Sequence, residues 1–407
     1  MKINVFKDLK NLIHLINLFF CKKKKNKNEN LNKIHFITNR RYFPNGGAGG
    51  GGAVQSANKI LFGDELNSVP LKYSFYEENK FNLKRKNDLW DLWGAIEFVF
   101  EKTKNEQNYA YITHDYGSAV GLALLGKRYV LVSHIQGSRV EEKLNFGEKF
   151  TDISKLIIQF CENFAFKNAV AVCFPSEGAY KYFCNSKYKT IKNNEFNFGG
   201  VLYNTLYAYP EPAIVENISR DESKLTFLSV GQLTTAKGMD KHTLFFDKLL
   251  QVTNKNIRYI FVGKGPLENS IIANLDKLKN KYLNFEYIHI KGCTYPQMQY
   301  LQNISDVYLM LHRISIFDLT TLELMNKSKC VILSEVGGNP EFNRDENIIL
   351  VGENQELAVE KFLNSDIKLL GKKNKEVYGK YFSNDKFREN YFKIIRKLIG
   401  EYKYAGG

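Results

Sequence analysis

The sequence predicts an α/β fold of two doubly wound, Rossmann-like domains that face a cleft. Short, nearly continuous apolar runs alternate with longer helical patterns along most of the chain, which is typical of parallel sheets covered on both faces. This alternation occurs twice, on either side of a polar segment around residues 205–224 that contains Pro210 and Pro212. At 407 residues, the chain is long enough for two cores of ordinary size.

The first domain is expected to span residues 31–208. Its apolar runs predict strands at Ile34–Thr38, Ala110–Thr113, Tyr129–Ser133, Val170–Pro175 and Val201–Tyr203. Helical patterns lie between these runs, near residues 53–61, 88–104, 117–126, 150–168 and 177–185. Strands separated by helices of this length indicate βαβ units and hence a parallel sheet.

The second domain is expected to span residues 209–375, and its alternation is cleaner. Strands are predicted at Thr226–Val230, Tyr259–Val262, Phe285–Ile290, Val307–Leu311, Val331–Ser334 and Ile348–Val351. Helices are predicted near residues 239–253, 266–280, 296–304, 319–327 and 355–364. Ligands of such sheets bind at the carboxyl ends of the strands, so the functional residues are sought there.

Residues 1–30 form an N-terminal extension of different character. Apolar side chains recur near helical spacing over residues 5–20, and a basic run, Lys22 to Lys25, follows them. The apolar part is too short to span a bilayer, which takes roughly 20 residues, and no small-residue cleavage site follows it. Two alternatives remain open: an amphipathic helix on an anionic membrane surface, or a helix packed on its own domain. We expect a cytoplasmic protein, which under the first alternative is peripheral on the cytoplasmic face of the inner membrane.

The formal net charge of +15 favours anionic partners such as nucleotide phosphates or an acidic lipid surface. Nucleic acid would also be attracted. However, the sequence has no zinc-finger spacing, no RNA-binding aromatic signature and no coiled-coil basic region. We therefore expect no nucleic-acid partner.

Three glycine-bearing turns follow strands of the second half. They lie at residues 230–238 with Gly231, Gln232 and Lys237, at residues 262–267 with Gly263 and Gly265, and at residues 334–341. Glycine at a strand end lets the backbone approach a ligand, and the free N–H groups of a following helix can bind a phosphate. Lys237 would add a positive charge for a diphosphate. A single turn of this kind is weak evidence, so the order of the three is what is informative.

In this order the turns resemble the nucleotide-binding domain of GT-B glycosyltransferases, specifically the retaining family 4 group, or glycosyl transferases group 1. The resemblance covers about residues 225–345, and Ser315 to Glu341 is similar to the family pattern EGFGLxxLEAMACGxPVIxSxxGGxPE. It implies a nucleotide-diphosphate-sugar donor on the second domain and an acceptor on the first. It also implies that no metal ion or other cofactor is needed. The apolar tail, residues 376–407, resembles the terminal helices that cross back to the first domain.

The resemblance assigns donor contacts residue by residue. Lys237 would hold the donor diphosphate, and Glu323 would accept hydrogen bonds from the nucleotide ribose. The backbone amides of Leu319 and Thr320, which open a helix, would meet phosphate or sugar. The glycine turns would complete the donor site with Gly231, Gln232, Gly263 and Gly265.

The sequence departs from the family pattern at three positions. Gln232 stands where the family has an arginine, Ser315 where it has the first glutamate of a pair, and Asp318 where it has a glycine. The first change removes a cation from the leaving-group site. The second removes a contact to the donor sugar, for which Asp318 is a candidate substitute.

The first half offers further candidates at predicted strand ends. A glycine run at residues 46–52 follows the first strand; it is either a flexible linker or, by resemblance, a loop at the donor phosphate that includes Gly47 and Gly49. No acidic residue closes the next strand as a dinucleotide fingerprint requires, so no nicotinamide cofactor is expected. His134 matches the family histidine that touches the donor sugar, and with Lys237 and Glu323 it makes up the expected catalytic set. The expected acceptor-side residues are Arg40, Arg41, His114, Asp115 and Arg139, of which the arginines suit an anionic acceptor.

The function expected from these residues is retaining, metal-independent transfer of a sugar, in the manner of a hexosyltransferase. The acceptor would be a glycan or glycolipid of the bacterial cell surface, such as lipopolysaccharide or capsule. Because Gln232 and Ser315 depart from the family, a non-catalytic partner that keeps the fold and binds a glycan is an alternative. A GT-B sugar epimerase or phosphorylase is another.

Overall fold

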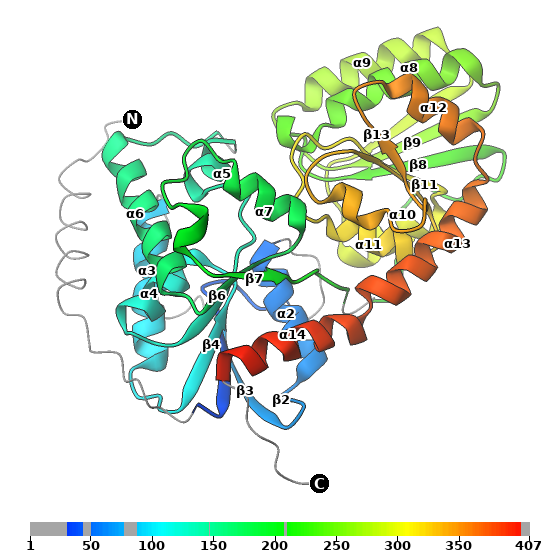
Figure 1. The fold of residues 1–407 in the computed structure, drawn as a ribbon. Coiled ribbons are helices and arrows are strands. Elements are labelled where there is room, and N and C mark those ends of the chain that lie inside the picture. The colour runs from blue at the N-terminus through cyan, green and yellow to red at the C-terminus, as the bar shows by residue number, and fades with distance from the viewer. Residues whose placement is uncertain (1–30, 44–49, 77–87, 146, 207–209, 400–407) are drawn as a thin grey trace.

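The computed structural model describes residues 31–43, 50–76, 88–145, 147–206 and 210–399. This part of the chain forms two α/β lobes, one built around the strands of residues 33–201 and the other around those of residues 224–351 (Figure 1). Each lobe holds its own predominantly parallel sheet, with helices on both faces. The two-domain, Rossmann-like architecture predicted from the alternation of apolar runs and helical patterns is confirmed.

The sheet of the first domain has seven strands within the described residues, in the order β2-β3-β1-β4-β5-β6-β7. Neighbouring strands are parallel except β2 and β3, which are antiparallel. The strands are β1 Lys33–Ile37, β2 Glu65–Leu66, β3 Val69–Ser74, β4 Tyr109–Thr113, β5 Tyr129–Val132, β6 Ala171–Phe174 and β7 Phe198–Val201. The strand order reverses at β1, because β3 pairs with one edge of it and β4 with the other. This is the topological switch point of the sheet.

The helices of the first domain explain why its strands are apolar on both faces. They are α2 Gly50–Phe62, α3 Asp88–Thr103, α4 Tyr116–Leu124, α5 Arg139–Asn145, α6 Asp152–Asn168 and α7 Glu177–Cys184. Tyr111 and Leu131 pack into the core formed with α3, α4 and α6. Ile112 and Val130 point the other way, into the core formed with α2 and the last helix of the described chain. Alternate residues of one strand thus enter different cores.

The sheet of the second domain is parallel, with six strands in the described chain in the order β10-β9-β8-β11-β12-β13. The strands are β8 Lys224–Val230, β9 Asn256–Val262, β10 Phe285–Ile290, β11 Val307–Met310, β12 Cys330–Ser334 and β13 Ile349–Val351. The helices are α8 His242–Val252, α9 Glu268–Lys281, α10 Tyr295–Ile304, α11 Leu319–Asn326, α12 Gln355–Leu363 and α13 Ile367–Val377. The switch point lies between β8 and β11.

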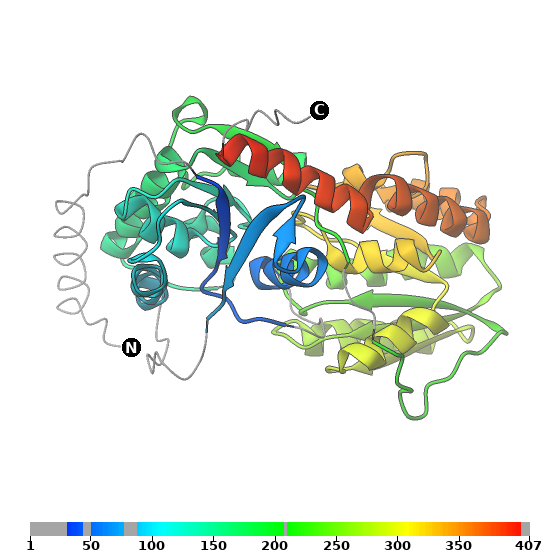
Figure 2. The ribbon, with the colours of Figure 1, turned by 90° about the horizontal axis from the view of Figure 1, so that it is seen from below.

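The end of the described chain returns from the second domain to the first (Figure 2). After α13, a π-helical turn, Tyr378–Phe382, contributes Tyr378 and Phe382 to the core of the second domain. Helix α14, Asn384–Ile399, then contributes Tyr391 and Leu398 to the core of the first. The hydroxyl of Thr205 donates to the carbonyl of Phe382 at 2.7 Å, so both crossings between the domains lie together.

Four elements were not predicted from the sequence. Strands β2 and β3 form a tight hairpin through Asn67 and Ser68, both with positive φ. Pro70 lies inside β3, and because proline is uncommon within strands, the sequence pattern does not indicate a strand there. Helix α5 is short and polar, and α13 has few apolar residues. In addition, helix α2 begins at Gly50, inside the glycine run, so the segment expected to be a loop is shorter than the sequence indicated.

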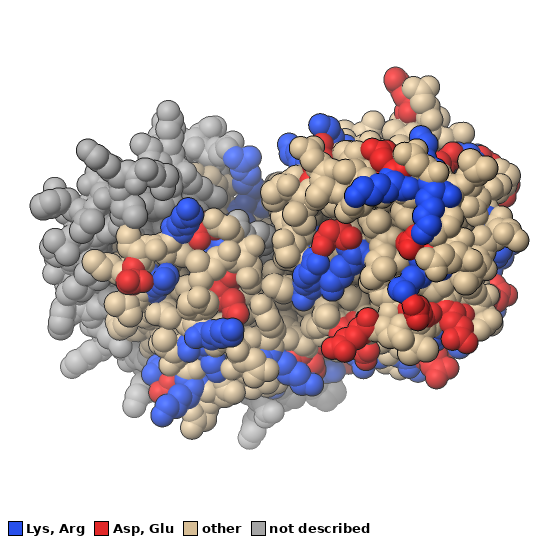
Figure 3. Space-filling view, turned by 90° about the horizontal axis from the view of Figure 1, so that it is seen from above, with Lys and Arg blue, Asp and Glu red and all other residues tan. Residues whose placement is uncertain are grey.

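Two observations concern the surface. No helix in the described ranges is both long and apolar enough to cross a bilayer, and the N-terminal extension, residues 1–30, lies outside those ranges. On the face shown in Figure 3, Lys and Arg side chains are interspersed with Asp and Glu. They do not merge into one continuous basic surface on that face.

Candidate active site

Lys237 lies at the switch point of the second sheet, where doubly wound folds bind their ligands. It follows β8, whereas His312 follows β11, and Lys237 Nζ lies 3.4 Å from His312 Nε2. His312 is buried, and burial followed by the charge of Lys237 lowers its pKa to about 3. The imidazole is therefore neutral, and it adds no charge that competes with Lys237 for an anion.

The turn that carries Lys237 is held by backbone packing and by one arginine. It is a 3₁₀ turn, Thr235–Lys237, that ends at Gly238, where φ is 68° and a Cβ atom would lie 1.9 Å from the carbonyl oxygen of Leu311. Arg313 donates to both carboxylate oxygens of Asp240, at 2.7 and 2.6 Å, and to the Thr235 carbonyl at 2.9 Å. The loops after β8 and β11 are thus clamped together around Lys237.

The first two glycine turns lie against each other. At Gly263 (φ 148°) a Cβ atom would lie 1.8 Å from the carbonyl oxygen of Gly231, so only glycine fits. A Cβ atom at Gly265 would lie 2.5 Å from the Leu233 carbonyl oxygen. The side chain of Gln232 is exposed. The turns therefore bring bare backbone to the carboxyl ends of β8 and β9.

Asp318 caps helix α11. Its Oδ2 accepts from the Thr321 backbone N–H at 3.1 Å, from the Thr321 hydroxyl at 3.0 Å and from the Tyr308 hydroxyl at 2.9 Å. Its Oδ1 lies 3.9 Å from Lys237 Nζ. Burial opposes ionisation, but Lys237 and these hydrogen bonds outweigh it and hold the pKa of Asp318 below its usual range. The carboxylate therefore orients α11 and pairs with Lys237. The N–H groups of Leu319 and Thr320 lie in the first turn of α11, where N–H groups have no hydrogen-bond partner within the helix.

Glu323 is buried on α11, and both of its carboxylate oxygens have partners on α10. Oε1 accepts from the Tyr295 hydroxyl at 2.8 Å, and Oε2 accepts from the Gln302 side-chain amide. Burial raises the pKa of Glu323 to about 7 despite these two donors. The Glu323 carboxyl therefore titrates near neutrality.

In the first domain, His134 and His114 form a stacked pair behind the carboxyl ends of β4 and β5. His114 Nδ1 lies 2.8 Å from His134 Nε2, and the rings stack at 5.0 Å. His114 Nε2 lies 3.0 Å from the Tyr391 hydroxyl of α14 and 3.5 Å from the amide nitrogen of Asn58. Burial lowers the pKa of both histidines, that of His134 to about 4. Both rings are neutral.

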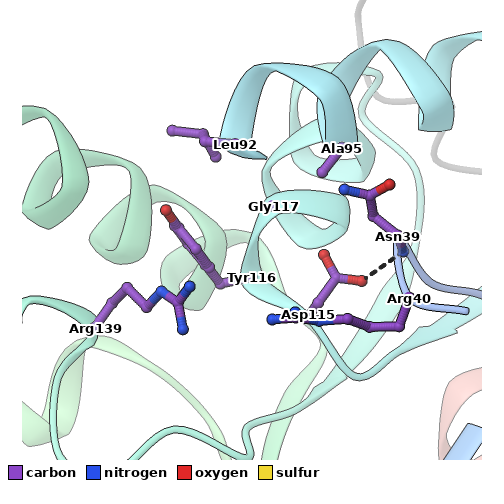
Figure 4. Close-up of a pocket in the computed structure, with 8 residues that line it drawn as sticks. All are labelled: Asn39, Arg40, Leu92, Ala95, Asp115, Tyr116, Gly117 and Arg139. Atoms are coloured by element: carbon purple, nitrogen blue, oxygen red, sulfur yellow. Dashed lines mark hydrogen bonds between the residues drawn. The ribbon is translucent and has the colours of Figure 1, made fainter. Parts of the chain in front are cut away.

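A pocket lies at the switch point of the first sheet, after β1 and β4 (Figure 4). Three of the residues expected on the acceptor side, Arg40, Asp115 and Arg139, line it together. The remaining lining residues are Asn39, Leu92, Ala95, Tyr116 and Gly117.

The other expected residues lie elsewhere. His114 is buried and bonds to His134, and Arg41 is exposed beside the pocket without lining it. Gly47 and Gly49 lie outside the described residues.

Residues 211–376 match the family model described as glycosyl transferases group 1. This match covers the second domain, and the chain as a whole has the GT-B fold. No curated protein sequence matches it.

Solved structures similar to this chain share its fold at low identity. A mutant of S. aureus TarM, in complex with fondaparinux, alpha-GlcNAc-glycerol and UDP, is 14% identical with a TM-score of 0.55, over 76% of this chain and 59% of that one. The chain therefore spans less than two thirds of TarM. The trehalose-6-phosphate protein from E. coli bound with UDP-2-fluoro glucose is 13% identical with a TM-score of 0.62, over 91% and 99%. Sucrose-phosphate synthase from Thermosynechococcus elongatus is 16% identical with a TM-score of 0.60, over 90% and 98%.

The two domains of the protein are joined at the third glycine turn. Glu341 of the second domain accepts from the backbone N–H groups of Glu177 and Gly178, at 3.0 and 2.8 Å, at the start of α7 in the first. A Cβ atom at Gly178 would lie 2.0 Å from the carbonyl carbon of Gly337. The carboxylate of Glu341 thus interacts with the positive end of α7, and the domains contact at Gly178 without a side chain between them.

Two residues of the site were not found from the sequence. His312 stands just after a strand, as His114 and His134 do, so the same signal identifies it. Tyr391 lies 277 residues from His114 in the chain. Nothing in the local pattern of an amphipathic terminal helix indicates which of its aromatic residues reaches the site.

Proposed function

We propose that this protein is a glycosyltransferase that moves a sugar from a nucleoside-diphosphate sugar to a glycan or lipid-linked acceptor, with retention of the anomeric configuration. The observation that carries the proposal is the placement of Lys237 between the switch point of the second sheet and the start of α11. A lysine and helix amides together suit a diphosphate. Two solved structures with this fold are described with UDP or UDP-2-fluoro glucose bound, which supports the same donor class here.

On the donor side, Lys237 and the amides of Leu319 and Thr320 would neutralise the leaving diphosphate without a metal ion. A positive charge fixed at this point stabilises the transition state most, because negative charge accumulates on the leaving group there. Glu323 would accept from the ribose. Asp318 would hold Lys237 and the start of α11 in position relative to each other, rather than contact the sugar directly.

On the sugar side, the hydrogen bonds around His114 define what His134 can do. The Tyr391 hydroxyl and the Asn58 amide both approach His114 Nε2, which makes that atom an acceptor and leaves the proton on Nδ1. His114 then donates to His134 Nε2, so the proton of neutral His134 is on its Nδ1. We propose that this N–H donates to a hydroxyl of the donor sugar. The leaving diphosphate itself would take the proton of the acceptor hydroxyl on the same face.

The destination we propose is a bacterial cell-surface glycan such as lipopolysaccharide or capsule, assembled at the cytoplasmic face of the inner membrane. The net charge of +15 and the basic run after residue 20 support attachment to an anionic surface. Deleting residues 1–30 should move the protein from the membrane to the soluble fraction. An unchanged distribution would contradict the membrane part of the proposal and leave the transfer reaction untouched.

The transfer reaction is tested by nucleotide release from a panel of UDP-, GDP- and ADP-sugars with cell-envelope acceptors. Lys237→Ala should lower kcat by about 10²- to 10³-fold, as the loss of one group that stabilises developing charge does elsewhere. Lys279→Ala is the matched control, because Lys279 is exposed on α9 and touches none of the site residues described above. Equal activity of the two variants would contradict the role of Lys237.

A non-catalytic partner protein is the second candidate, and the replacement of the family's first glutamate by Ser315 favours it. Ser315 is buried, and its carbonyl accepts from the Gly338 N–H at 3.0 Å. Its backbone therefore helps to hold the third glycine turn in place. Absence of release from every donor, with no thermal stabilisation by any nucleotide, would support this candidate. Conversion of the sugar without an acceptor, or dependence on inorganic phosphate, would instead indicate an epimerase or a phosphorylase.

A further inference from the structure

The pocket of the first domain is a formed site at a position where ligands bind. It is a small hollow, open to solvent, with a volume of about 30 Å³, between the loop after β1, the start of α4 and the first turns of α3. Leu92 and Ala95 of α3 close its apolar side. A Cβ atom at Gly117 would lie 2.7 Å from that of Ala95, so the close packing of α3 on α4 fixes this wall.

Two guanidinium groups reach into this pocket from opposite sides (Figure 4). Arg139 is buried and held: its backbone N–H donates to Glu162 at 2.8 Å, its Nη1 donates to Glu142, and its guanidinium lies 5.3 Å from the centre of the Tyr116 ring. Arg40 is exposed, and among the described residues no carboxylate lies within ion-pair distance of it. The two groups point toward one another across the opening.

The acidic group that lines the pocket is already committed to the scaffold. Asp115 accepts from the Thr38 hydroxyl at 3.0 Å, from the Asn39 N–H at 2.9 Å and from Ser118 through its N–H at 2.7 Å and its hydroxyl at 2.9 Å. These four donors engage both carboxylate oxygens. Asp115 therefore fixes the loop after β1 against α4 and leaves the two arginines as the groups that meet a ligand.

We propose that this pocket binds a phosphate group carried by the acceptor substrate. Arg139 already pairs with Glu142, so Arg40 brings the charge that no described carboxylate balances, and the planar fork of each arginine matches phosphate oxygens. Asp115 and His114 both follow β4, and His134 follows β5, so the pocket and the sugar-side histidine lie at the same edge of the first sheet. The assignment of the phosphate to the acceptor rests on the proposed function, but phosphate binding by the pocket does not depend on it.

The test measures binding of inorganic phosphate to the full chain by calorimetry, at low salt and without donor. Arg40→Gln should weaken phosphate binding by about tenfold or more, the effect of losing one charge-assisted hydrogen bond. Arg41→Gln is the matched control, because it removes the same charge from the next residue, which does not line the pocket. Arg139→Lys is the second variant, because it keeps the buried charge but loses the fork, and it should also weaken binding.

Turnover then identifies the source of the phosphate. A soluble sugar phosphate and its unphosphorylated sugar form one pair of acceptors, and vesicles with and without a phosphorylated lipid form the other. Arg40→Gln should raise KM for the phosphorylated acceptor of one pair and leave KM for the unphosphorylated acceptor of that pair unchanged. The pair that shows this effect identifies the source of the phosphate.

Equal loss of phosphate binding in Arg40→Gln and Arg41→Gln would overturn the inference, because it would indicate general surface charge. Turnover that ignores phosphorylation in both pairs would overturn it as well. Specific phosphate binding without any binding of a nucleotide sugar would instead contradict the proposed function and leave the pocket intact.

Discussion

Glu162 offers a direct test of how the start of α5, beside the pocket of the first domain, is held. It is 1% exposed on α6, and its Oε1 accepts from the backbone N–H of Arg139, the first residue of α5. Burial raises the pKa of its carboxyl to about 8, against an ordinary value of 4.5, although the Arg139 N–H lowers it. Glu162→Gln keeps an oxygen that accepts the same hydrogen bond and removes the titration.

The direction of the effect follows from the proton each state holds. Below the ordinary pKa of about 4.5 both the folded and the unfolded chain carry the proton, and Glu162 makes no pH-dependent contribution. As the pH rises, the unfolded chain loses its proton first, so the free energy of unfolding falls until the folded carboxyl ionises near pH 8. Between about pH 5.5 and about pH 8.5 the two pKa values correspond to a loss of about 3 kcal/mol.

Urea unfolding of wild type and variant at these two pH values measures this quantity. Because all other groups titrate alike in both proteins, the gain in stability of Glu162→Gln over wild type should grow by about 3 kcal/mol from the lower to the higher pH. Glu101→Gln, at an exposed position of α3, is the control and should show no such growth. A difference for Glu162→Gln that stays constant with pH would refute the reasoning.

Three further outcomes are expected. Tyr391→Phe removes the hydroxyl 3.0 Å from His114 Nε2 and should lower the free energy of unfolding by about 1–2 kcal/mol in urea, with a fall in kcat as His134 loses its fixed tautomer. Gly178→Ala places a methyl group 2.0 Å from the Gly337 carbonyl carbon, so small-angle scattering should record a larger radius of gyration, and kcat should fall by about tenfold or more. Because the pKa of Glu323 is about 7, the Kd of a nucleoside-diphosphate sugar should fall about tenfold from about pH 6 to about pH 8, and Glu323→Gln should abolish this dependence.

Each of these outcomes has a clear contrary. Unchanged stability in Tyr391→Phe would mean that the His114 ring is held without the hydroxyl. An unchanged radius of gyration in Gly178→Ala would mean that the domains do not meet in solution as they do here. A pH-independent Kd for wild type would mean that Glu323 does not contact the donor as a carboxylate.

The order of apolar runs was enough to predict both sheets, because strands buried on two faces have a continuous pattern that survives without an alignment. The structure places Lys237, which the glycine turn singled out, at the switch point of the second sheet, and Arg40, Asp115 and Arg139 around that of the first. Partners were not predictable in this way. The Asp318 carboxylate accepts hydrogen bonds from Thr321 and Tyr308 and caps α11. Asp318 stands where the family pattern has a glycine, and the sequence alone does not indicate which groups its carboxylate contacts.

Long-range contacts were the other limit. The hairpin of β2 and β3 was missed because Pro70 is uncommon inside a strand, although here the strand pairs on both sides. Glu341 is the last residue of a glycine turn in the sequence, yet two of its partners are backbone amides more than 160 residues away. Backbone partners leave no trace in the residue types.

Helix α14 has a consequence for the order in which the chain is completed during synthesis. Phe387, Tyr391 and Leu398 fill one core of the first domain, which otherwise consists of strands and α2 from the first half of the chain. A ribosome that has finished every strand of the first sheet must still translate the whole second domain before that core can close. In that interval the first domain is a half-covered sheet whose apolar face is open to water, to a chaperone or to the nascent second domain. Separate expression of the two lobes would divide this core between two polypeptides.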